Sequence, residues 1–440
     1  MHSSYFSNES VATLSHDQKA AVRLINDHPS GYAVACLTGA AGTGKTFTTK
    51  RIVESTNREV ILTATTNKAA RVLAEATGYS ATTIHRALCL SMQRSPITGH
   101  QELVQKELPV LPKGALLIID EASMIDEELL GYILQAAEMF EVFVLYVGDH
   151  CQLPPVGKDP ELFNGRFTHI KLSTIQRQAL GNPIVELASK YRDLIEGNTK
   201  LQPEIVTALN KEGEGIEVLN TKEFRARIAE AFSADDADDI KVCAYTNKCA
   251  IKHNHDIRAA IYGEELADAE SIMVGERLIV AKPVLGGGDN LLLAVEDEIV
   301  VSSLRQAMHP PSGVSGLEIP FGDDVVLFVP DDLIEANLYV EKMRKKAMRA
   351  TCQHKISATM ESDNERRAAW RKFFKADRAF HDLRHGYAST THKAQGSTFR
   401  TVFIDLPDLM TCRDTALRNR LFYTALTRAS HRAVINGGVR

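Results

Sequence analysis

The segment that most constrains the fold is the glycine-rich run Gly-Ala-Ala-Gly-Thr-Gly-Lys-Thr at residues 39–46. An apolar stretch precedes it at residues 32–38, and a helix-like stretch follows it at residues 47–54. A strand, a glycine-rich turn, Lys-Thr and a helix in this order are the context of a phosphate-binding loop. The glycines let successive backbone N–H groups face one point, where the N-terminus of the helix adds positive charge. Lys45 is expected at the β- and γ-phosphates and Thr46 on Mg²⁺. The residues expected to bind nucleotide here are Gly39, Ala40, Ala41, Gly42, Thr43, Gly44, Lys45 and Thr46.

Two acidic residues supply the second half of such a site. Residues 115–119 are a nearly continuous apolar run, as expected for a parallel strand that is buried on both faces. Asp120 and Glu121 follow it directly. Asp120 is expected to hold Mg²⁺ through its water shell, and Glu121 to orient and deprotonate the attacking water. The alternative is that the pair only caps the next helix, but its combination with Lys45 and Thr46 favours a nucleotide triphosphatase.

Composition narrows the class of protein. A chain of 440 residues with 44% hydrophobic and 24% charged residues is typical of a soluble globular protein with two to four domains. The N-terminal residues lack the pattern of a signal peptide, and no apolar run reaches the roughly 18 residues of a membrane span. The seven cysteines form no C-x-x-C pair, which predicts reduced thiols in the cytoplasm and argues against zinc. The net charge of −5 means that a polyanion would have to bind a local basic surface.

Several further residues are weak candidates when each is taken alone. Gln18 lies in the first turn of a predicted helix over 14–25, capped by Ser15, and by itself is best interpreted as a surface residue. Gln152 follows a predicted strand over 141–147 and can sense a γ-phosphate by hydrogen bonding. Arg177 follows another strand and is a candidate arginine finger.

The rest of the chain adds two insertions and a second α/β unit. Residues 86–114 interrupt the α/β alternation and predict an inserted β-hairpin, with Leu103 and Val104 near its tip. Short strands and turns between 277 and 329 suggest a small barrel. Residues 341–385 are expected to be helical and basic. Trp370 there favours core packing over contact with nucleic acid. In the last segment, Tyr423 and Arg428 are expected on one helix, where the arginine can reach the nucleotide and the tyrosine can stack on it.

Taken together, these segments resemble the superfamily-one DNA helicases, in particular the RecD-like branch. The resemblance spans nearly the whole chain in the order of the family's motifs. It is carried by residues 39–46, 65–70, 83–85, 118–123, 147–156, the Arg177 segment, 245–248, 391–398 and 421–429.

The resemblance implies a fold and a set of domains. It implies an α/β protein with two RecA-like parallel-sheet lobes, a small pin insertion in the first lobe and a β-rich, SH3-like accessory domain in the second. The implied domains are lobe 1A at 1–85 and 114–177, pin lobe 1B at 86–113, lobe 2A at 178–262 and 386–440, and accessory domain 2B at 263–385.

The resemblance also implies roles for matching residues. Gln18 falls where the family reads adenine, and Gln152, Arg177 and Arg428 fall on its γ-phosphate sensors. Lys45, Thr46, Asp120 and Glu121 fall on its Mg-ATP site. The residues that match segments lining the single-strand channel, or coupling it to ATP, are Thr65, Asn67, Thr83, His85, Thr246, Asn247, Thr391, His392 and Lys393.

The implied activity is ATP-dependent movement from 5′ to 3′ on single-stranded DNA, with unwinding of duplex DNA in replication or recombination. The implied cofactors are ATP and Mg²⁺. The implied partners are single-stranded and forked DNA, with a single-strand-binding protein or other replication proteins as further partners of a monomer. Thr66 stands where the family commonly has proline, and the pin lacks aromatic residues, which leaves steric strand separation as its expected action. A nucleotide-switched binding protein, an RNA helicase of the same superfamily and a metal-dependent nuclease are the alternatives, and the nuclease fits the sequence least well.

Overall fold

The computed structural model divides into two compact units. The first unit comprises residues 1–227, 238–247 and 390–440, and the second comprises 228–237 and 248–389. The residues that the structure describes are 14–29, 31–94, 101–155, 161–163, 165–174, 181–233, 239–265, 272–286, 291–322 and 325–438.

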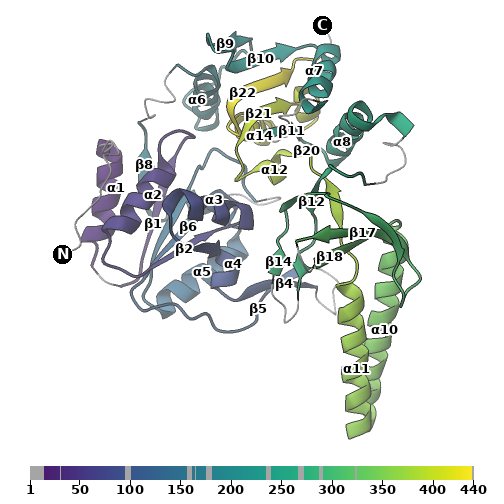
Figure 1. The fold of residues 1–440 in the computed structure, drawn as a ribbon. Helices are drawn as coiled ribbons and strands as arrows, with labels where there is room; N and C mark the ends of the chain where they lie inside the picture. The colour runs from purple at the N-terminus through teal and green to yellow at the C-terminus, as the bar shows by residue number, and fades with distance from the viewer. Residues whose placement is uncertain are drawn as a thin grey trace, which may run out of the picture. The chain divides into compact units, whose positions relative to one another are not determined.

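The first unit begins with a six-stranded, all-parallel sheet in the order β3-β2-β6-β7-β1-β8 (Figure 1). Central strands β6 and β7 are almost entirely buried, as their apolar runs predict. Because the strands are parallel, the turns after β1, β6 and β7 lie at one edge of the sheet, the usual place of a ligand site in such folds. The strands are β1 (Ala33–Gly39), β2 (Val60–Ala64), β3 (Ala81–Thr83), β6 (Leu116–Asp120), β7 (Phe143–Gly148) and β8 (Thr168–Leu172).

Helices cover both faces of this sheet. On one face α1 (His16–Asp27), α2 (Lys45–Ser55) and α3 (Asn67–Thr77) bury Ile25, Ile52 and Leu73 against it. On the other face, α4 (Ile84–Ala87) and α5 (Glu127–Met139) pack on alternate residues of the same strands. The predicted cap of α1 is confirmed, since Ser15 forms a capping box with Gln18. We call this part, residues 14–174, the first lobe.

The insertion between α4 and β6 forms the predicted hairpin. Strands β4 (Leu90–Arg94) and β5 (Gln101–Gln105) pair antiparallel. The prediction that Leu103 and Val104 lie near the tip is wrong, because both lie within β5 and Leu103 packs into the core of the first lobe. Residues 95–100, which connect the strands, lie outside the described residues.

The second lobe is the remainder of the first unit, described over residues 181–227, 239–247 and 390–438. Its strands in this unit run in the order β11-β21-β22-β10-β9, parallel except for the short edge strand β9. The strands are β9 (Ala208–Leu209), β10 (Gly215–Leu219), β11 (Ile240–Ala244), β21 (Phe399–Ile404) and β22 (Ala429–Asn436). The helices are α6 (Pro183–Ile195), α7 (Thr221–Ser233), α12 (Thr391–Ala394), α13 (Leu406–Leu409) and α14 (Thr415–Leu426). These two lobes confirm the predicted fold class of paired RecA-like parallel sheets.

The second unit is β-rich, as predicted, with one helical extension. Its strands share one apolar core that includes Leu278, Val280, Ile319 and Leu327. Closure of these strands into an SH3-like barrel stays a prediction. The strands are β12 (Arg277–Val280), β13 (Val284–Leu285), β14 (Leu291–Leu293), β15 (Glu298–Val300), β16 (Arg305–Met308), β17 (Ser315–Phe321), β18 (Val325–Pro330), β19 (Leu383–His385) and, at its border, β20 (Ala388–Thr390). Helix α8 (Asn247–Tyr262) lies mostly in this unit, where Arg258 forms a buried ion pair with Glu276 at 2.7 Å.

Two long helices, α10 (Leu333–Ser357) and α11 (Met360–Asp377), pack along one another (Figure 1). The prediction of helix from 341 to 385 is partly wrong, because α10 begins earlier and residues 383–385 form β19. The packing role favoured for Trp370 is confirmed. Its ring contacts Phe373 edge-on at 5.5 Å, and its Nε1 donates to Thr351 on the neighbouring helix at 3.0 Å.

Candidate active site

The glycine-rich segment forms a loop between β1 and α2, as predicted. Gly44 precedes the first residue of α2 with a φ of 80°, a left-handed conformation that glycine adopts without a steric penalty. Lys45 folds back over the loop, and its Nζ donates to the carbonyl oxygens of Gly39 at 2.8 Å and Ala40 at 3.1 Å. An ammonium group held by loop carbonyls is positioned to exchange these acceptors for phosphate oxygens.

The two acidic residues lie at the end of β6, beside this loop. Asp120 Oδ1 accepts a hydrogen bond from the backbone N–H of Glu121 at 2.9 Å. Burial and the neighbouring Glu121 carboxylate raise the pKa of Asp120 to about 6, and the charge of Lys45 only partly opposes them. A buried carboxylate whose charge is only partly compensated is suited to bind a divalent cation. Carboxylate and hydroxyl oxygens are the ligands that Mg²⁺ prefers. Asp120 and Thr46 are therefore the residues that would hold it.

Glu121 has a strained backbone. Its φ of 52° and ψ of 40° place it in the left-handed region, which a non-glycine residue adopts only when its surroundings require it. The carbonyl oxygen of Glu121 accepts hydrogen bonds from Met124 N at 3.1 Å and from Thr65 Oγ1 at 3.3 Å. The expected catalytic glutamate is thus held by its backbone, and one of its partners belongs to the segment expected to meet DNA.

The interpretation of Gln18 as a surface residue is wrong. Its side chain is 2% exposed, because α1 packs against the phosphate loop. The side-chain oxygen accepts from Ser15 N at 3.0 Å, and Nε2 donates to the carbonyl oxygen of Thr43 at 3.3 Å. A glutamine fixed against the loop in this way is well placed to act beside a bound nucleotide, so the position is consistent with the adenine role that the resemblance implies.

The loop after β7 meets the second lobe through Gln395. This residue follows α12 and is buried, as are Ser123 and Gln152 opposite it. Gln395 Nε2 donates to Ser123 Oγ at 3.1 Å, and to Gln152 Oε1 and the carbonyl oxygen of Leu153 at 3.3 Å each. Gln395 lies within the matched segment 391–398, but no role for it follows from the sequence. A buried amide with three partners on another lobe becomes visible only in three dimensions.

Gly396 brings the second lobe against the catalytic pair. A β-carbon built at Gly396 would lie 3.8 Å from Glu121 Cγ and 3.8 Å from Thr66 Oγ1. Its φ of 77° is again left-handed, so the turn after α12 favours glycine. The turn of the second lobe at Gly396 therefore lies beside the residue expected to activate water.

Of the two predicted γ-phosphate-sensing arginines, the structure describes Arg428 but not Arg177. Arg177 lies outside the described residues. Arg428 follows α14, which ends at Leu426, so the prediction that Tyr423 and Arg428 share one helix is wrong. The Arg428 guanidinium is buried and donates to the carbonyl oxygens of Ser397 at 3.0 Å and Thr424 at 3.3 Å.

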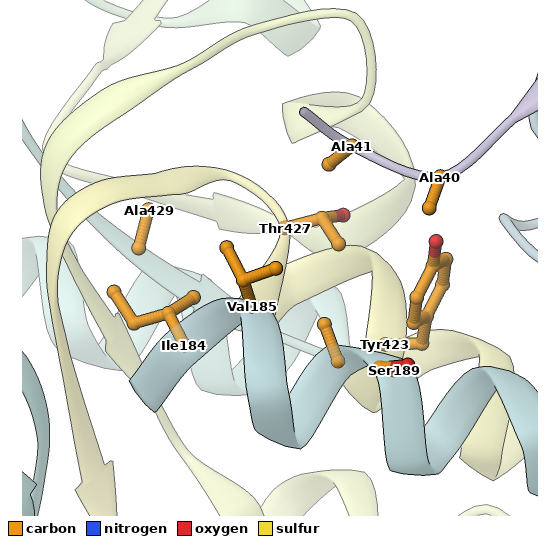
Figure 2. Close-up of a pocket in the computed structure, with 9 residues that line it drawn as sticks. Ala40, Ala41, Ile184, Val185, Ser189, Tyr423, Thr427 and Ala429 are labelled. Atoms are coloured by element: carbon orange, nitrogen blue, oxygen red, sulfur yellow. The ribbon is translucent and has the colours of Figure 1, made fainter. Parts of the chain in front are cut away.

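A small cavity of about 60 Å³ lies between the phosphate loop and the second lobe. Figure 2 shows Tyr423 reaching from α14 toward Ala40, with Thr427 beside it. The phenol ring is fully buried, and its hydroxyl donates to Asp149 Oδ2 at 2.5 Å. Stacking of this ring on a nucleotide stays a prediction. The cavity is lined by Ala40, Ala41, Ile184, Val185, Ala188, Ser189, Tyr423, Thr427 and Ala429.

Comparison with known proteins agrees with this arrangement. A family described as "AAA domain" matches residues 13–218, and one described as "UvrD-like helicase C-terminal domain" matches residues 385–435. The ATP-dependent DNA helicase Dda of Enterobacteria phage T4 is 26% identical, and the alignment covers 90% of this chain and 92% of that protein. The chain belongs to the superfamily-one helicases.

Two more relatives match shorter parts of this helicase. The ATP-dependent RecD2 DNA helicase of Deinococcus radiodurans is 40% identical over 37% of this chain and 22% of its own length. The ATP-dependent DNA helicase Pif1 of Campylobacter jejuni is 33% identical over 30% of this chain and 31% of its own length. Among the described residues, no helix combines the length and the apolar character needed to cross a membrane.

Several residues expected to meet DNA lie at the N-termini of helices in this helicase. Thr83 Oγ1 caps α4 by accepting from Arg86 N at 3.2 Å, and Asn67 is the first residue of α3. Asn247 is the first residue of α8, and Thr246 before it donates from Oγ1 to Asp408 Oδ1 at 2.8 Å. Helix N-termini of this kind are suited to phosphate groups of a nucleic-acid backbone.

The three expected DNA contacts on α12 differ in their exposure to solvent. Thr391 is fully buried and donates to the carbonyl oxygen of Ala244 at 3.1 Å, so direct contact with a strand would fall to His392 and Lys393. Burial lowers the pKa of His392, and it also lowers the pKa of His85 in the first lobe. Both imidazoles are therefore neutral at pH 7, and they would meet DNA as hydrogen-bonding groups rather than as cations.

Proposed function

We propose that this superfamily-one helicase is an ATP-dependent DNA helicase that moves 5′ to 3′ on single-stranded DNA and unwinds duplex DNA. The observation that carries the proposal is the approach of Gly396 in the second lobe to Glu121 beside the phosphate loop. A triphosphate bound by this loop would lie where both lobes meet, so its hydrolysis would change how they fit together. The alignment with the phage T4 DNA helicase along 90% of the chain supports DNA as the nucleic acid.

In the proposed reaction, Lys45 leaves the carbonyl oxygens of Gly39 and Ala40 and binds the β- and γ-phosphates of ATP. Mg²⁺ held by Thr46 and Asp120 supplies positive charge at the phosphate oxygens when it is bound. Glu121 orients the attacking water and takes its proton. Gln152, Arg177 and Arg428 sense the γ-phosphate, and the two arginines stabilise the charge that spreads over its oxygens in the transition state.

Movement along DNA follows from alternating grip. Thr65 and Thr83 belong to the first lobe, whereas Thr246 and His392 belong to the second. Opening and closing of the lobes during each ATP cycle would change which set holds the backbone, and directed steps result. The hydrogen bond from Thr65 to the Glu121 carbonyl oxygen supports direct coupling of the two sites.

The decisive experiment uses forked DNA with a single 5′ or 3′ tail, ATP and Mg²⁺. We expect unwinding of the 5′-tailed fork and DNA-stimulated ATP hydrolysis. Unwinding of only the 3′-tailed fork would reject the proposed direction, and stimulation by RNA alone would reject DNA as the substrate. We further propose that the protein works as a monomer in the cytoplasm, that of the host if the chain is phage-encoded. A single-strand-binding protein or other replication proteins would be its further partners.

A further inference from the structure

A buried carboxylate joins the two lobes beside the proposed nucleotide site. Asp149 follows β7 of the first lobe and is 0% exposed. It accepts from Arg192 Nη1 at 2.8 Å and from the Tyr423 hydroxyl at 2.5 Å, and both donors belong to the second lobe. It also accepts from Cys151 N at 3.1 Å within its own loop. One carboxylate thus holds three donors from α6, α14 and the loop after β7.

The surroundings of the two side-chain donors, Arg192 and Tyr423, favour these contacts. Arg192 Nε donates to Glu196 Oε1 at 3.0 Å, one turn further along α6. Burial opposes the ionisation of Glu196, but hydrogen bonds from Lys171 and the charge of Arg192 outweigh it and hold the pKa of Glu196 at about 2. Burial and the charge of Asp149 raise the pKa of Tyr423 far above its usual value, so its hydroxyl stays protonated and donates. The geometry is therefore set before any ligand binds.

The carboxylate and its partner Tyr423 lie close in sequence to two of the proposed γ-phosphate sensors, Gln152 and Arg428. In the first lobe Asp149 precedes Gln152 by three residues of one loop, and in the second Tyr423 precedes Arg428 by five. Arg420, one turn before Tyr423 on α14, also donates from Nη1 to the carbonyl oxygen of Gln152 at 3.0 Å. The loop of Gln152 and helix α14 are thus connected by a buried hydrogen bond from Tyr423 and a partly buried one from Arg420.

We propose that Asp149, Arg192 and Tyr423 are positioning residues that make the loop of Gln152 and helix α14 move as one body, so that loss of the γ-phosphate at Gln152 displaces Arg428. This role depends on the Tyr423 hydroxyl and not on its ring, whose predicted stacking on the nucleotide is a separate contact. The inference rests on the proposed function, because it assigns them a role within DNA-stimulated ATP hydrolysis. A buried carboxylate that loses one donor keeps its charge, and water cannot reach it to replace the lost hydrogen bond. Even a small substitution of a donor should therefore lower activity measurably.

The test compares two phenol-to-phenyl changes in the same lobe. Tyr423→Phe removes the hydroxyl that Asp149 accepts. Tyr191→Phe is the matched control, because Tyr191 is also buried and its hydroxyl accepts from Gln202 inside the second lobe. For each variant, thermal unfolding, the KM for ATP, the DNA-stimulated kcat and the number of base pairs unwound per ATP would be measured.

We expect Tyr423→Phe to lower kcat about tenfold, the equivalent of one charge-assisted hydrogen bond, while KM changes less than about twofold. Base pairs unwound per ATP should fall as well, whereas Tyr191→Phe should keep both values even if it loses as much stability. Asp149→Asn should cause a similar loss, and the double variant should be little worse than the worse single one. If wild type is active and Tyr423→Phe behaves like Tyr191→Phe, the inference is wrong. If wild type shows no DNA-stimulated hydrolysis, the proposed function fails and the inference with it.

Discussion

The side-chain amide of Gln395 in the second lobe donates to Oε1 of Gln152 in the first, with 3.3 Å between nitrogen and oxygen. Both residues are buried, and Ser123 beside the catalytic pair accepts from the same amide group. This contact joins the segment expected to hold DNA to the residue expected to sense the γ-phosphate. It defines a short path along which the two sites of a helicase can influence one another.

Gln395→Glu should separate ATP hydrolysis from unwinding. The carboxylate cannot donate to Gln152, Ser123 or Leu153, and its charge would face the carbonyl oxygen of Leu153, which can only accept. We expect at least a tenfold loss of unwinding rate, with a smaller loss of ATP hydrolysis, measured on the same forked DNA. Gln202→Ala is the control, since Gln202 donates to Tyr191 and Asn419 within the second lobe. Equal losses of unwinding in the two variants would contradict the coupling role.

Lys45→Ala should abolish DNA-stimulated ATP hydrolysis. The ammonium is held at the loop expected to bind the phosphates, and groups that stabilise transition-state charge contribute on the order of 10²–10³ in rate. Lys50→Ala on the same helix, α2, tests whether loss of any lysine there has this effect. Hydrolysis rates and circular dichroism of both variants would be compared. Normal unwinding by Lys45→Ala would refute the assignment of the nucleotide site.

Asp120→Asn should stabilise the metal-free protein while removing Mg-dependent hydrolysis. The pKa of Asp120 is raised to about 6, above its unfolded value, so the stability that the protonated group contributes is present at pH 4 and is lost as the pH rises through 6. At pH 7.5, replacing the charged carboxylate of Asp120 with the neutral amide of asparagine should increase the free energy of unfolding by on the order of 1–2 kcal/mol. Chemical denaturation without and with Mg²⁺ measures this. A less stable variant in the absence of Mg²⁺ would show that the carboxylate is not short of positive charge.

Gln18→Glu should weaken the preference for adenine. Glutamate preserves the capping box with Ser15 but cannot donate to the carbonyl oxygen of Thr43. We expect the KM for ATP to rise about tenfold and the KM for GTP to change little, so the ratio of the two is the informative quantity. A variant that hydrolyses both nucleotides with unchanged KM would exclude Gln18 from base recognition.

Mild acid should destabilise the protein through its buried histidines. Burial lowers the pKa of His85, His150 and His392 below the unfolded value near 6.5. The unfolded chain therefore binds more protons between pH 6.5 and 5, and the free energy of unfolding should fall as the pH is lowered across that window. Urea denaturation at pH 7.5 and 5.5 would measure the fall. The double variant His85→Gln/His392→Gln should show a shallower pH dependence, and an unchanged slope would exclude these two groups as its source.

The sequence by itself determined the local elements around the site. A glycine-rich turn followed by Lys-Thr, between an apolar strand and a helix, is typical of a phosphate-binding loop. Gly39 to Thr46 form such a turn between β1 and α2, as predicted. The apolar run before Asp120 predicts a strand buried on both faces, because local periodicity reflects which faces are covered. The cap at Ser15 and the hairpin insertion likewise depend on neighbours in the chain.

The tertiary structure decided which side chains meet across the lobes. From its sequence Gln18 is interpreted as a surface residue, but it is buried because α1 packs on the phosphate loop. The partner of Gln395 is likewise known only from the structure, where its side chain donates to Gln152 of the first lobe. Asp149 and Tyr423 are 274 positions apart, yet they share a buried hydrogen bond. Contacts of this kind depend on how two separately folded sheets are set against each other, and no local pattern of residue types encodes that placement.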